Sequence, residues 1–349
     1  MNYSDRPRDD PFAEVVESYY LETTEGLFFA VKGLEHPPDR FIAVLRYAPD
    51  PKRGDRKKGG ESYRRLYHFA EQEQFIQASY PQYLAYDPVF QATLQGVPRS
   101  LVRHIYDPCL RLQELSQAPD RTEIEEDAVA LASLLQKQAG VPSSKLGITG
   151  SLLISLQNEL SDLDIAVFGT QNCKKVYQAL QRLLDGRSGT ELRRFDAQGV
   201  EALYAQRVAD TRIAFHEFVN LEERKVNQGS FRKRTYFIRF IKEAHEGIYG
   251  HLHYTPLGRV AISASIADDR DAIFTPCRYL VSDVHGLEGI PPADLSEIVS
   301  FRGRFCEQAL AGESVMAAGT LERIQSSRGD TWHRLLLGNF PEDTMVVRR

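Results

Sequence analysis

The sequence predicts an α+β fold in which a central run of helices and strands is flanked by two regions rich in strands. Between residues 122 and 184, two segments with helical spacing of apolar residues flank two apolar segments of strand length. Residues 15–47 and the chain after residue 258 instead show short strand-like segments separated by turn residues. The predicted domains are therefore 1–118, 119–250 and 251–349.

The N-terminal region, residues 1–118, is predicted to combine an antiparallel sheet with short helices. Its strand-like segments are rich in aromatic and β-branched residues, and they are 15–21, 27–32 and 41–47. Segments 70–79 and 88–95 are predicted to be short helices. A polar, proline-containing stretch at 116–120 marks the end of this region.

A helix is predicted at the start of the central region, because residues typical of helix ends mark both of its termini. Thr122 is its predicted N-cap, Glu125 closes a capping box three residues later, and Gly140 ends it. A second helix is predicted over 172–184, where apolar residues line one face. The remaining elements expected here are helices at 197–208 and 213–226 and a strand at 234–242.

The C-terminal region is predicted to be a small β-barrel or a compact antiparallel sheet. Its five strand-like segments are 260–266, 273–281, 297–305, 314–324 and 331–338. Such modules often bind nucleic acid, and the side chains available for that role are Arg302, Arg304, Arg323 and Trp332. A scaffold or dimerisation domain is the alternative interpretation.

Composition narrows the class of protein. The chain has 349 residues, of which 42% are hydrophobic and 26% charged, as in a globular protein with a large core. No apolar run approaches the roughly 20 residues that cross a bilayer, so no membrane partner is expected. The four cysteines are far apart and form no CxxC pair, which favours a cytoplasmic location over a secreted one.

Two carboxylates stand two residues apart in an apolar segment. Asp162 and Asp164 alternate with the apolar residues Leu163, Ile165 and Val167, so in a strand both carboxylates would share one face. Two neighbouring carboxylates repel each other unless a cation lies between them. Mg²⁺, or Mn²⁺ in its place, is the expected metal, because it binds through one or two carboxylates together with substrate phosphates.

A glycine-serine turn precedes this pair and supplies a site for the phosphates. Gly150 and Ser151 follow an apolar strand and open an apolar helical turn, where backbone N–H groups and the serine hydroxyl can bind an anion. The ten residues from 152 to 161 leave room for one short helix that returns the chain beside the first strand. Gly150, Ser151 and Ser161 are the predicted nucleotide-binding residues.

This pattern resembles the signature of the DNA polymerase β-like nucleotidyltransferase superfamily. It consists of Gly150-Ser151, a spacer of ten residues and Asp162-Leu-Asp-Ile165. The surrounding residues are similar to a set of predicted archaeal and bacterial nucleotidyltransferases of undefined substrate, over segments from Phe28 to Asn339. The resemblance implies a polymerase β-like core, a mixed sheet with helices. It also implies that the Gly-Ser turn holds the triphosphate and that Asp162 and Asp164 bind two metal ions.

The superfamily places a third metal-binding carboxylate on a later strand. The matching strand here carries Arg239 at its centre, which departs from the family pattern. Glu243 shares a strand face with Arg239 and is the predicted third catalytic carboxylate. Glu217 and Asp210 are the alternatives.

The sequence therefore predicts a Mg²⁺-dependent nucleotidyltransferase that transfers a nucleoside monophosphate from a nucleoside triphosphate to a hydroxyl acceptor and releases pyrophosphate. RNA is the preferred acceptor, ahead of a protein hydroxyl or a small molecule. Basic groups expected to contact phosphates include Lys174 and Lys175, and the local patches are 52–58, 224–225 and 232–234. The first patch is interpreted as a solvated loop. The alternative is a non-catalytic protein that binds nucleotide or RNA on the same scaffold.

Overall fold

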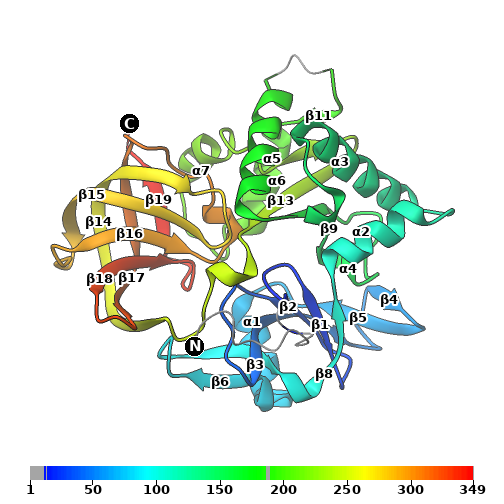
Figure 1. Ribbon diagram of the computed structural model, residues 1–349, viewed down its shortest axis with the longest axis horizontal. Helices are drawn as coiled ribbons and strands as arrows, with labels where there is room; N and C mark the ends of the chain where they lie inside the picture. Colours follow the sequence, from blue (N-terminus) through cyan, green and yellow to red (C-terminus); the bar gives the residue numbers. More distant parts are fainter. Residues whose placement is uncertain (1–11, 13, 186–188, 349) are drawn as a thin grey trace. The chain divides into compact units, whose positions relative to one another are not determined.

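The computed structural model describes residues 12, 14–185 and 189–348, and its architecture is α+β with several sheets (Figure 1). The chain forms two compact units. The first comprises 1–87, 92–176 and 240–249, and the second comprises 88–91, 177–239 and 250–349. Each unit contains parts of more than one predicted domain, and the predicted boundaries stay predictions.

The N-terminal part of the first unit is an antiparallel sheet with the strand order β4-β5-β3-β2-β1-β8. These strands are β1 (Tyr20–Thr23), β2 (Phe28–Val31), β3 (Arg40–Pro49), β4 (Arg56–Lys58), β5 (Glu61–Arg65) and β8 (Val102–Tyr106). β6 (Leu84–Asp87) pairs with β7 (Ala92–Pro98), which also pairs with β3. The sheet predicted for this region is therefore present, although 15–19 precedes its first strand.

One predicted helix in this region is confirmed and one is wrong. Helix α1 (Phe69–Ser79) lies where 70–79 was expected to be helical. Segment 88–95, in contrast, is a turn followed by β7, which hydrogen-bonds to β6 and β3. Strand pairing with residues far away in the sequence outweighs the local pattern here.

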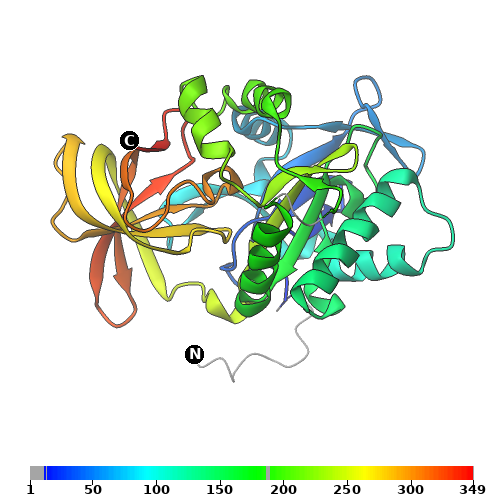
Figure 2. The ribbon, with the colours of Figure 1, turned by 90° about the horizontal axis from the view of Figure 1, so that it is seen from above.

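The first unit also contains the segment with the Gly-Ser turn. β9 (Leu146–Ile148) and β10 (Leu163–Phe168) pair antiparallel, and α4 (Gly150–Leu153) with a following loop joins them. Helices α2 (Pro108–Gln117) and α3 (Glu123–Ala139) pack against these strands (Figure 2). The capping box is confirmed, because the Glu125 carboxylate accepts a hydrogen bond from the Thr122 N–H at 3.0 Å.

After residues 88–91, the second unit resumes within helix α5 (Thr170–Leu183) and ends with the β-rich C-terminal part. Helices α6 (Ala197–Arg207) and α7 (Phe215–Glu222) lie where helices were predicted. Strands β11 (Leu192–Arg193), β12 (Gln228–Phe231) and β13 (Arg234–Ile241) pair antiparallel in sequence order. The last two residues of β13 belong to the first unit, where the Gly169 N–H donates to the Ile241 carbonyl at 2.8 Å.

The C-terminal strands pair in a closed circuit, β14-β15-β16-β18-β17-β14, with β19 added beside β17. They are β14 (Leu252–Asp271), β15 (Cys277–Glu288), β16 (Leu295–Ser300), β17 (Ser314–Ser326), β18 (Thr331–Leu337) and β19 (Thr344–Val347). Their buried faces share one apolar core that includes Ile262, Tyr279 and Leu335. None of the helices in the described residues is long and apolar enough to cross a membrane.

Several basic residues expected to contact nucleic acid instead form ion pairs within the second unit. Arg302 and Arg304 both pair with Asp210, at 3.4 and 3.7 Å. Arg224 donates to both carboxylate oxygens of Glu313 at 2.9 Å. Lys225 is buried and pairs with Glu222 at 2.8 Å. These four cations stabilise the fold of the second unit, and exposed basic residues such as Lys233 are left for any phosphate contact.

We expect His36 to make the first unit sensitive to acid. Its Nε2 atom is buried and its Nδ1 accepts a hydrogen bond from the Ile42 N–H at 3.2 Å. Burial, with a smaller contribution from Arg99, lowers the pKa of His36 from 6.5 to about 3. Protonation therefore favours the unfolded state. The resulting loss in the free energy of unfolding is absent well above pH 6.5, reaches about 2 kcal/mol at pH 5 and grows until about pH 3.

Urea unfolding at pH 7 and pH 5 measures this effect. In His36→Asn the side-chain oxygen can still accept a hydrogen bond from the Ile42 N–H, but the side chain does not titrate. The free energy of unfolding of this variant should therefore fall about 2 kcal/mol less between pH 7 and pH 5 than that of the wild-type protein. Equal losses in the two proteins would contradict the assignment.

Candidate functional site

The Gly-Ser turn and Asp164 lie in direct contact within the first unit. The Thr149 N–H donates to the Asp164 carbonyl at 3.0 Å, which fixes the start of the turn against β10. A Cβ added to Gly150 would lie 2.2 Å from Asp164 Oδ2. Gly150 also has a φ of +67°, where residues with a side chain are strained. Only glycine therefore lets the backbone turn directly over this carboxylate.

The two predicted carboxylates differ in their surroundings. Asp164 is half-buried in β10, while Asp162 is exposed and lies one residue before that strand. Leu163, Ile165 and Val167 are buried, as the alternating pattern predicted. The Asp164 carboxylate forms no hydrogen bond or ion pair within the described part of the chain. An accessible, unpaired carboxylate beside a backbone turn can bind a cation.

Three cations hold the short helix that follows the turn. Arg111 donates to the Leu152 carbonyl at 3.2 Å, Lys58 to the Ile154 carbonyl at 2.8 Å and Arg56 to the Leu156 carbonyl at 3.2 Å. The Leu152 and Ile154 carbonyls lie at the C-terminal end of α4, where the helix has no internal donors for them, and Leu156 lies in the loop that follows.

The apolar side of the same segment packs against the N-terminal sheet. Leu153, Ile154 and Leu156 form one buried cluster with residues of β1, β2, β3 and β5. The Thr149 hydroxyl donates to the Ser18 carbonyl at 2.6 Å. The sheet thus helps to fix the position of the Gly-Ser turn, together with β9 and β10.

The basic segment 52–58 is only partly the solvated loop that its composition predicted. Arg56 and Lys58 lie in β4, and both are used to hold the segment after α4. Lys52, Arg53 and Lys57 are exposed, in agreement with the prediction. The sequence gives no sign of this difference, because it depends on which residues face the loop 100 positions away.

Ser161 has a structural role that the sequence did not predict. Its hydroxyl accepts from Arg56 Nη1 at 2.9 Å and from the Asn158 N–H at 3.0 Å, and the residue is buried. The structure therefore does not support Ser161 as a nucleotide ligand. The Ser151 hydroxyl, in contrast, forms no hydrogen bond with the residues that the structure describes, and it remains available for a phosphate.

Glu243, the predicted third catalytic carboxylate, contacts the start of α5. Its carboxylate accepts a hydrogen bond from the Thr170 N–H at 2.9 Å, at the start of α5. Thr170 follows β10, six residues after Asp164, which corresponds to roughly 20 Å along an extended strand. The spacing of residues in the sequence placed Glu243 on the same strand face as Arg239. It does not show how far along β10 the Glu243 carboxylate lies from Asp164.

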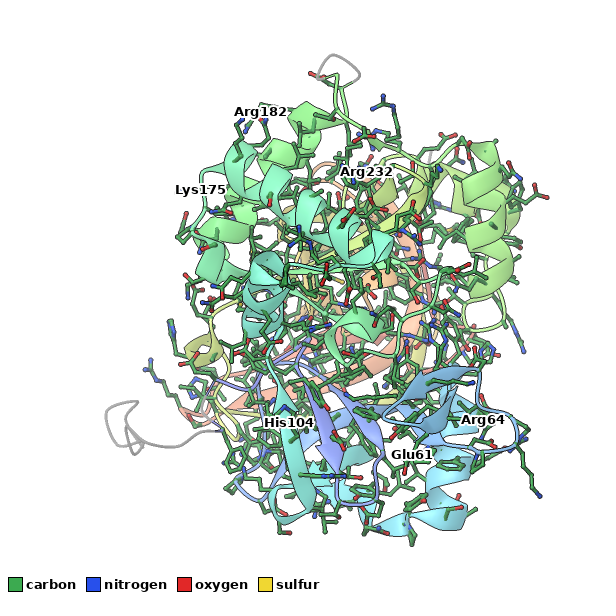
Figure 3. The ribbon with its side chains drawn as sticks, turned by 90° about the vertical axis from the view of Figure 1, so that its right-hand side faces the viewer. Glu61, Arg64, His104, Lys175, Arg182 and Arg232 are labelled. Carbon is green, nitrogen blue, oxygen red and sulfur yellow. The ribbon has the colours of Figure 1, made fainter. Side chains whose placement is uncertain are left out.

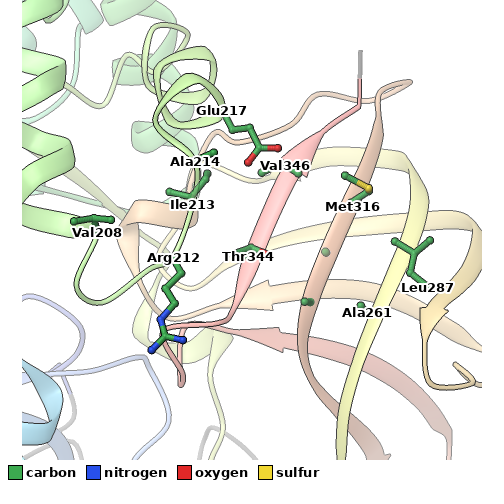
Figure 4. Close-up of a pocket in the computed structure, with 12 residues that line it drawn as sticks. Val208, Arg212, Ile213, Ala214, Glu217, Ala261, Leu287, Met316, Thr344 and Val346 are labelled. Atoms are coloured by element: carbon green, nitrogen blue, oxygen red, sulfur yellow. The ribbon is translucent and has the colours of Figure 1, made fainter.

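The other two candidate carboxylates lie in the second unit and have different surroundings. Asp210 pairs with Arg302 and Arg304. Glu217 lines an open cavity of about 600 Å³ with mostly apolar walls, including Leu287 and Met316 (Figure 4). Within 12, 14–185 and 189–348, no three His, Cys, Asp or Glu residues group closely enough to hold a metal ion. The pair Asp162 and Asp164 thus stays a predicted cation site with two carboxylates.

Sequence reasoning missed a set of arginines and tyrosines beside Asp164. Burial lowers the pKa of Arg65, but Tyr47, Tyr20 and Asp164 raise it, and it lies above its ordinary value. Burial raises the pKa of Tyr20 to about 12, and Arg46 acts in the opposite direction. No motif marks these residues, because β1, β3 and β5 bring them together only in the folded sheet.

The chain is 30% identical to the uncharacterized protein MJ1086 of Methanocaldococcus jannaschii over 332 residues, which are 93% of this chain and 95% of the archaeal protein. The chain belongs to the family of that protein. No family model matches the chain, and no solved structure matches it. Because the alignment spans nearly the whole length of both proteins, family membership covers both compact units.

Gly150→Ala should destabilise the protein more than an alanine at another glycine of similar conformation. Gly140 has a φ of +62° with nothing within 4 Å of an added Cβ, so Gly140→Ala should cost about 1 kcal/mol from backbone strain alone. Gly150→Ala adds a clash with Asp164 and should cost about 2–4 kcal/mol. Urea unfolding measures both. When Asp164 is also replaced by alanine, the difference in destabilisation between Gly150→Ala and Gly140→Ala should shrink. An unchanged difference would refute the contact between Gly150 and Asp164.

Arg56→Ala should destabilise the first unit by about 2–3 kcal/mol, because the Leu156 carbonyl and the Ser161 hydroxyl lose a charged donor in a buried setting. Lys57→Ala is the matched control, since Lys57 is the exposed next residue of β4, and it should change stability by less than about 0.5 kcal/mol. Equal effects of the two substitutions in thermal unfolding would argue against a role of Arg56 in holding the segment after α4.

Proposed function

We propose that this protein is a metal-dependent nucleotidyltransferase, with Mg²⁺ or Mn²⁺ as its metal and a nucleoside triphosphate as its donor. The observation that carries the proposal is the contact between the Gly150 backbone and the Asp164 carboxylate. It places a turn with a free serine hydroxyl beside an unpaired carboxylate. A triphosphate bound to the turn could then share a metal ion with that carboxylate.

The residues of the first unit have distinct roles in this proposal. Gly150 and Ser151 bind the β- and γ-phosphates through backbone N–H groups and the serine hydroxyl. Asp164 and Asp162 would hold a metal ion, and such an ion would supply positive charge against the phosphates. Because α4 has only four residues, the turn itself and Ser151 carry the anion binding, without support from a long helix.

The transfer requires positioning more than covalent help from the protein. The acceptor hydroxyl oxygen attacks the α-phosphorus, the bond to the bridging oxygen of the β-phosphate breaks, and pyrophosphate leaves while the hydroxyl proton passes to solvent. The cations Arg56, Lys58 and Arg111 contribute by keeping the turn in place.

The finer fold assignments belong to the same proposal. We interpret the antiparallel pair β9–β10 with α4 between its strands as the signature part of a polymerase β-like core. The closed circuit of β14 to β18 is interpreted as a small β-barrel. RNA is the proposed acceptor, although four of the basic residues considered for it are committed to ion pairs in the second unit.

The missing third carboxylate supports a second candidate function. A site with two carboxylates can bind one metal ion and a nucleotide without turnover, so the protein would then be a non-catalytic binder of nucleotide or RNA. The observation in its favour is that Glu243 is engaged with Thr170 and that no three-residue metal cluster occurs in the described residues.

Label transfer from radioactive ATP, GTP, CTP and UTP to an RNA pool, with Mg²⁺ or Mn²⁺, tests the first function. Asp162→Ala and Asp164→Ala should each lower the rate about 100-fold or more, because each removes a metal ligand worth several kcal/mol in the transition state. Glu159→Gln, at an exposed carboxylate of the preceding loop, should transfer label at nearly the wild-type rate.

Transfer that survives the double substitution of Asp162 and Asp164 by alanine would refute the assignment. Calorimetry with a non-hydrolysable triphosphate separates the second candidate function. Binding that depends on Asp164, with no acceptor modified under any condition, would favour the non-catalytic protein.

A further inference from the structure

Two arginines from neighbouring strands of the N-terminal sheet share one aromatic ring. The Arg46 guanidinium carbon lies 5.7 Å from the centroid of the Tyr67 ring, and that of Arg65 lies 5.1 Å from it. Arg65 is opposite Tyr47 in the β3–β5 ladder. Arg46 is the extra residue of a bulge, because Phe28 pairs with Tyr47 and Phe29 with Leu45. Bulges of this kind redirect a side chain.

Neither arginine forms a side-chain hydrogen bond or ion pair within the part of the chain that the structure describes, although the negative charge of Asp164 helps to raise the pKa of Arg65. Both are half-buried, and the Arg65 Nε atom is fully buried without a hydrogen-bond partner. Two positive charges held against one ring repel each other, and a buried unpaired donor costs about 1–3 kcal/mol. An anion bound between the two guanidinium groups would remove both costs.

The adjacent residue of β5 shows how differently an ordinary arginine is placed. Arg64, labelled in Figure 3, pairs with Glu71 at 2.6 Å and with Asp50 at 3.3 Å. Arg64 and Arg65 thus differ in charge environment although they are consecutive in the chain. Surface charge alone does not explain why Arg46 and Arg65 lack such partners.

Two buried tyrosines lie near these arginines. Tyr20 is 6% exposed and Tyr47 is 2% exposed, and neither hydroxyl forms a hydrogen bond with another described residue. Because the pKa of Tyr20 is raised to about 12, mainly by burial, its hydroxyl keeps its proton at neutral pH and can donate to an anion. Both tyrosines also pack against the segment that follows the Gly-Ser turn.

We infer that Arg46 and Arg65, with the Tyr20 hydroxyl, form a second anion subsite that binds a phosphate group of the substrate beside Asp164. Planar guanidinium groups match a phosphate because each can donate two parallel hydrogen bonds. The identity of the ligand rests on the proposed function, whereas the anion preference follows from two guanidinium groups that share one ring and form no ion pair in the described residues. The triphosphate would then be held from two sides, by the turn at Gly150 and by the arginines of β3 and β5.

Isothermal titration with inorganic tripolyphosphate in the presence of Mg²⁺ tests the subsite without any choice of base. Arg46→Gln and Arg65→Gln should each weaken binding at least tenfold. Arg64→Gln, the matched control, should change the affinity less than twofold. Circular dichroism establishes that each variant is folded. Should a glutamine variant fail to fold, Arg46→Lys and Arg65→Lys keep the charge but lose the paired donors, and an intermediate loss of affinity is expected.

The outcomes separate this inference from the proposed function. If the wild-type protein transfers nucleotides and the variants of Arg46 and Arg65 bind tripolyphosphate as well as Arg64→Gln does, the subsite is overturned and the transferase proposal stands. If no transfer occurs but tripolyphosphate binding depends on Arg46 and Arg65, the subsite stands and the transferase proposal fails. No detectable binding of tripolyphosphate by the wild-type protein overturns the subsite.

Discussion

The contact between the Gly150 backbone and the Asp164 carboxylate is the constraint on which the candidate site depends. It exists because residue 150 has no side chain and because its φ is positive, so the chain can turn directly above the carboxylate. A four-residue helix would be too short to hold such a turn by itself. The surrounding cations and the apolar cluster of the N-terminal sheet supply the missing support.

The basic residues of the first unit fall into two groups according to what they contact. Arg56, Lys58 and Arg111 donate to backbone carbonyls, so their charges are used to fix the shape of the turn. Arg46 and Arg65 contact an aromatic ring and form no ion pair in the described residues. Sequence composition does not distinguish these groups, yet they imply different chemistry: the first group maintains the site, and the second is available to a ligand.

Local patterns predicted the parts of this structure that depend on neighbours in the chain. The capping box of α3, the alternation of β10 and the Gly-Ser turn all follow from residues within a short window. The features that local patterns did not indicate depend on distant partners. Segment 88–95 becomes β7 because β3 and β6 pair with it, and Glu243 reaches the far end of β10. Arg46 and Arg65 were missed for the same reason, since a bulge and a strand ladder bring them together.

The hydrogen bond from the Thr149 hydroxyl to the Ser18 carbonyl spans 131 positions of the chain. Together with Arg56 and Lys58, it makes residues 18–58 a structural requirement of a motif that begins at residue 150. A truncated fragment that starts near residue 119 would keep every letter of the signature but would expose Leu153 and Leu156 to water. Such a fragment would be an unsuitable substitute for the intact chain in biochemical work, even though a motif search would regard it as complete.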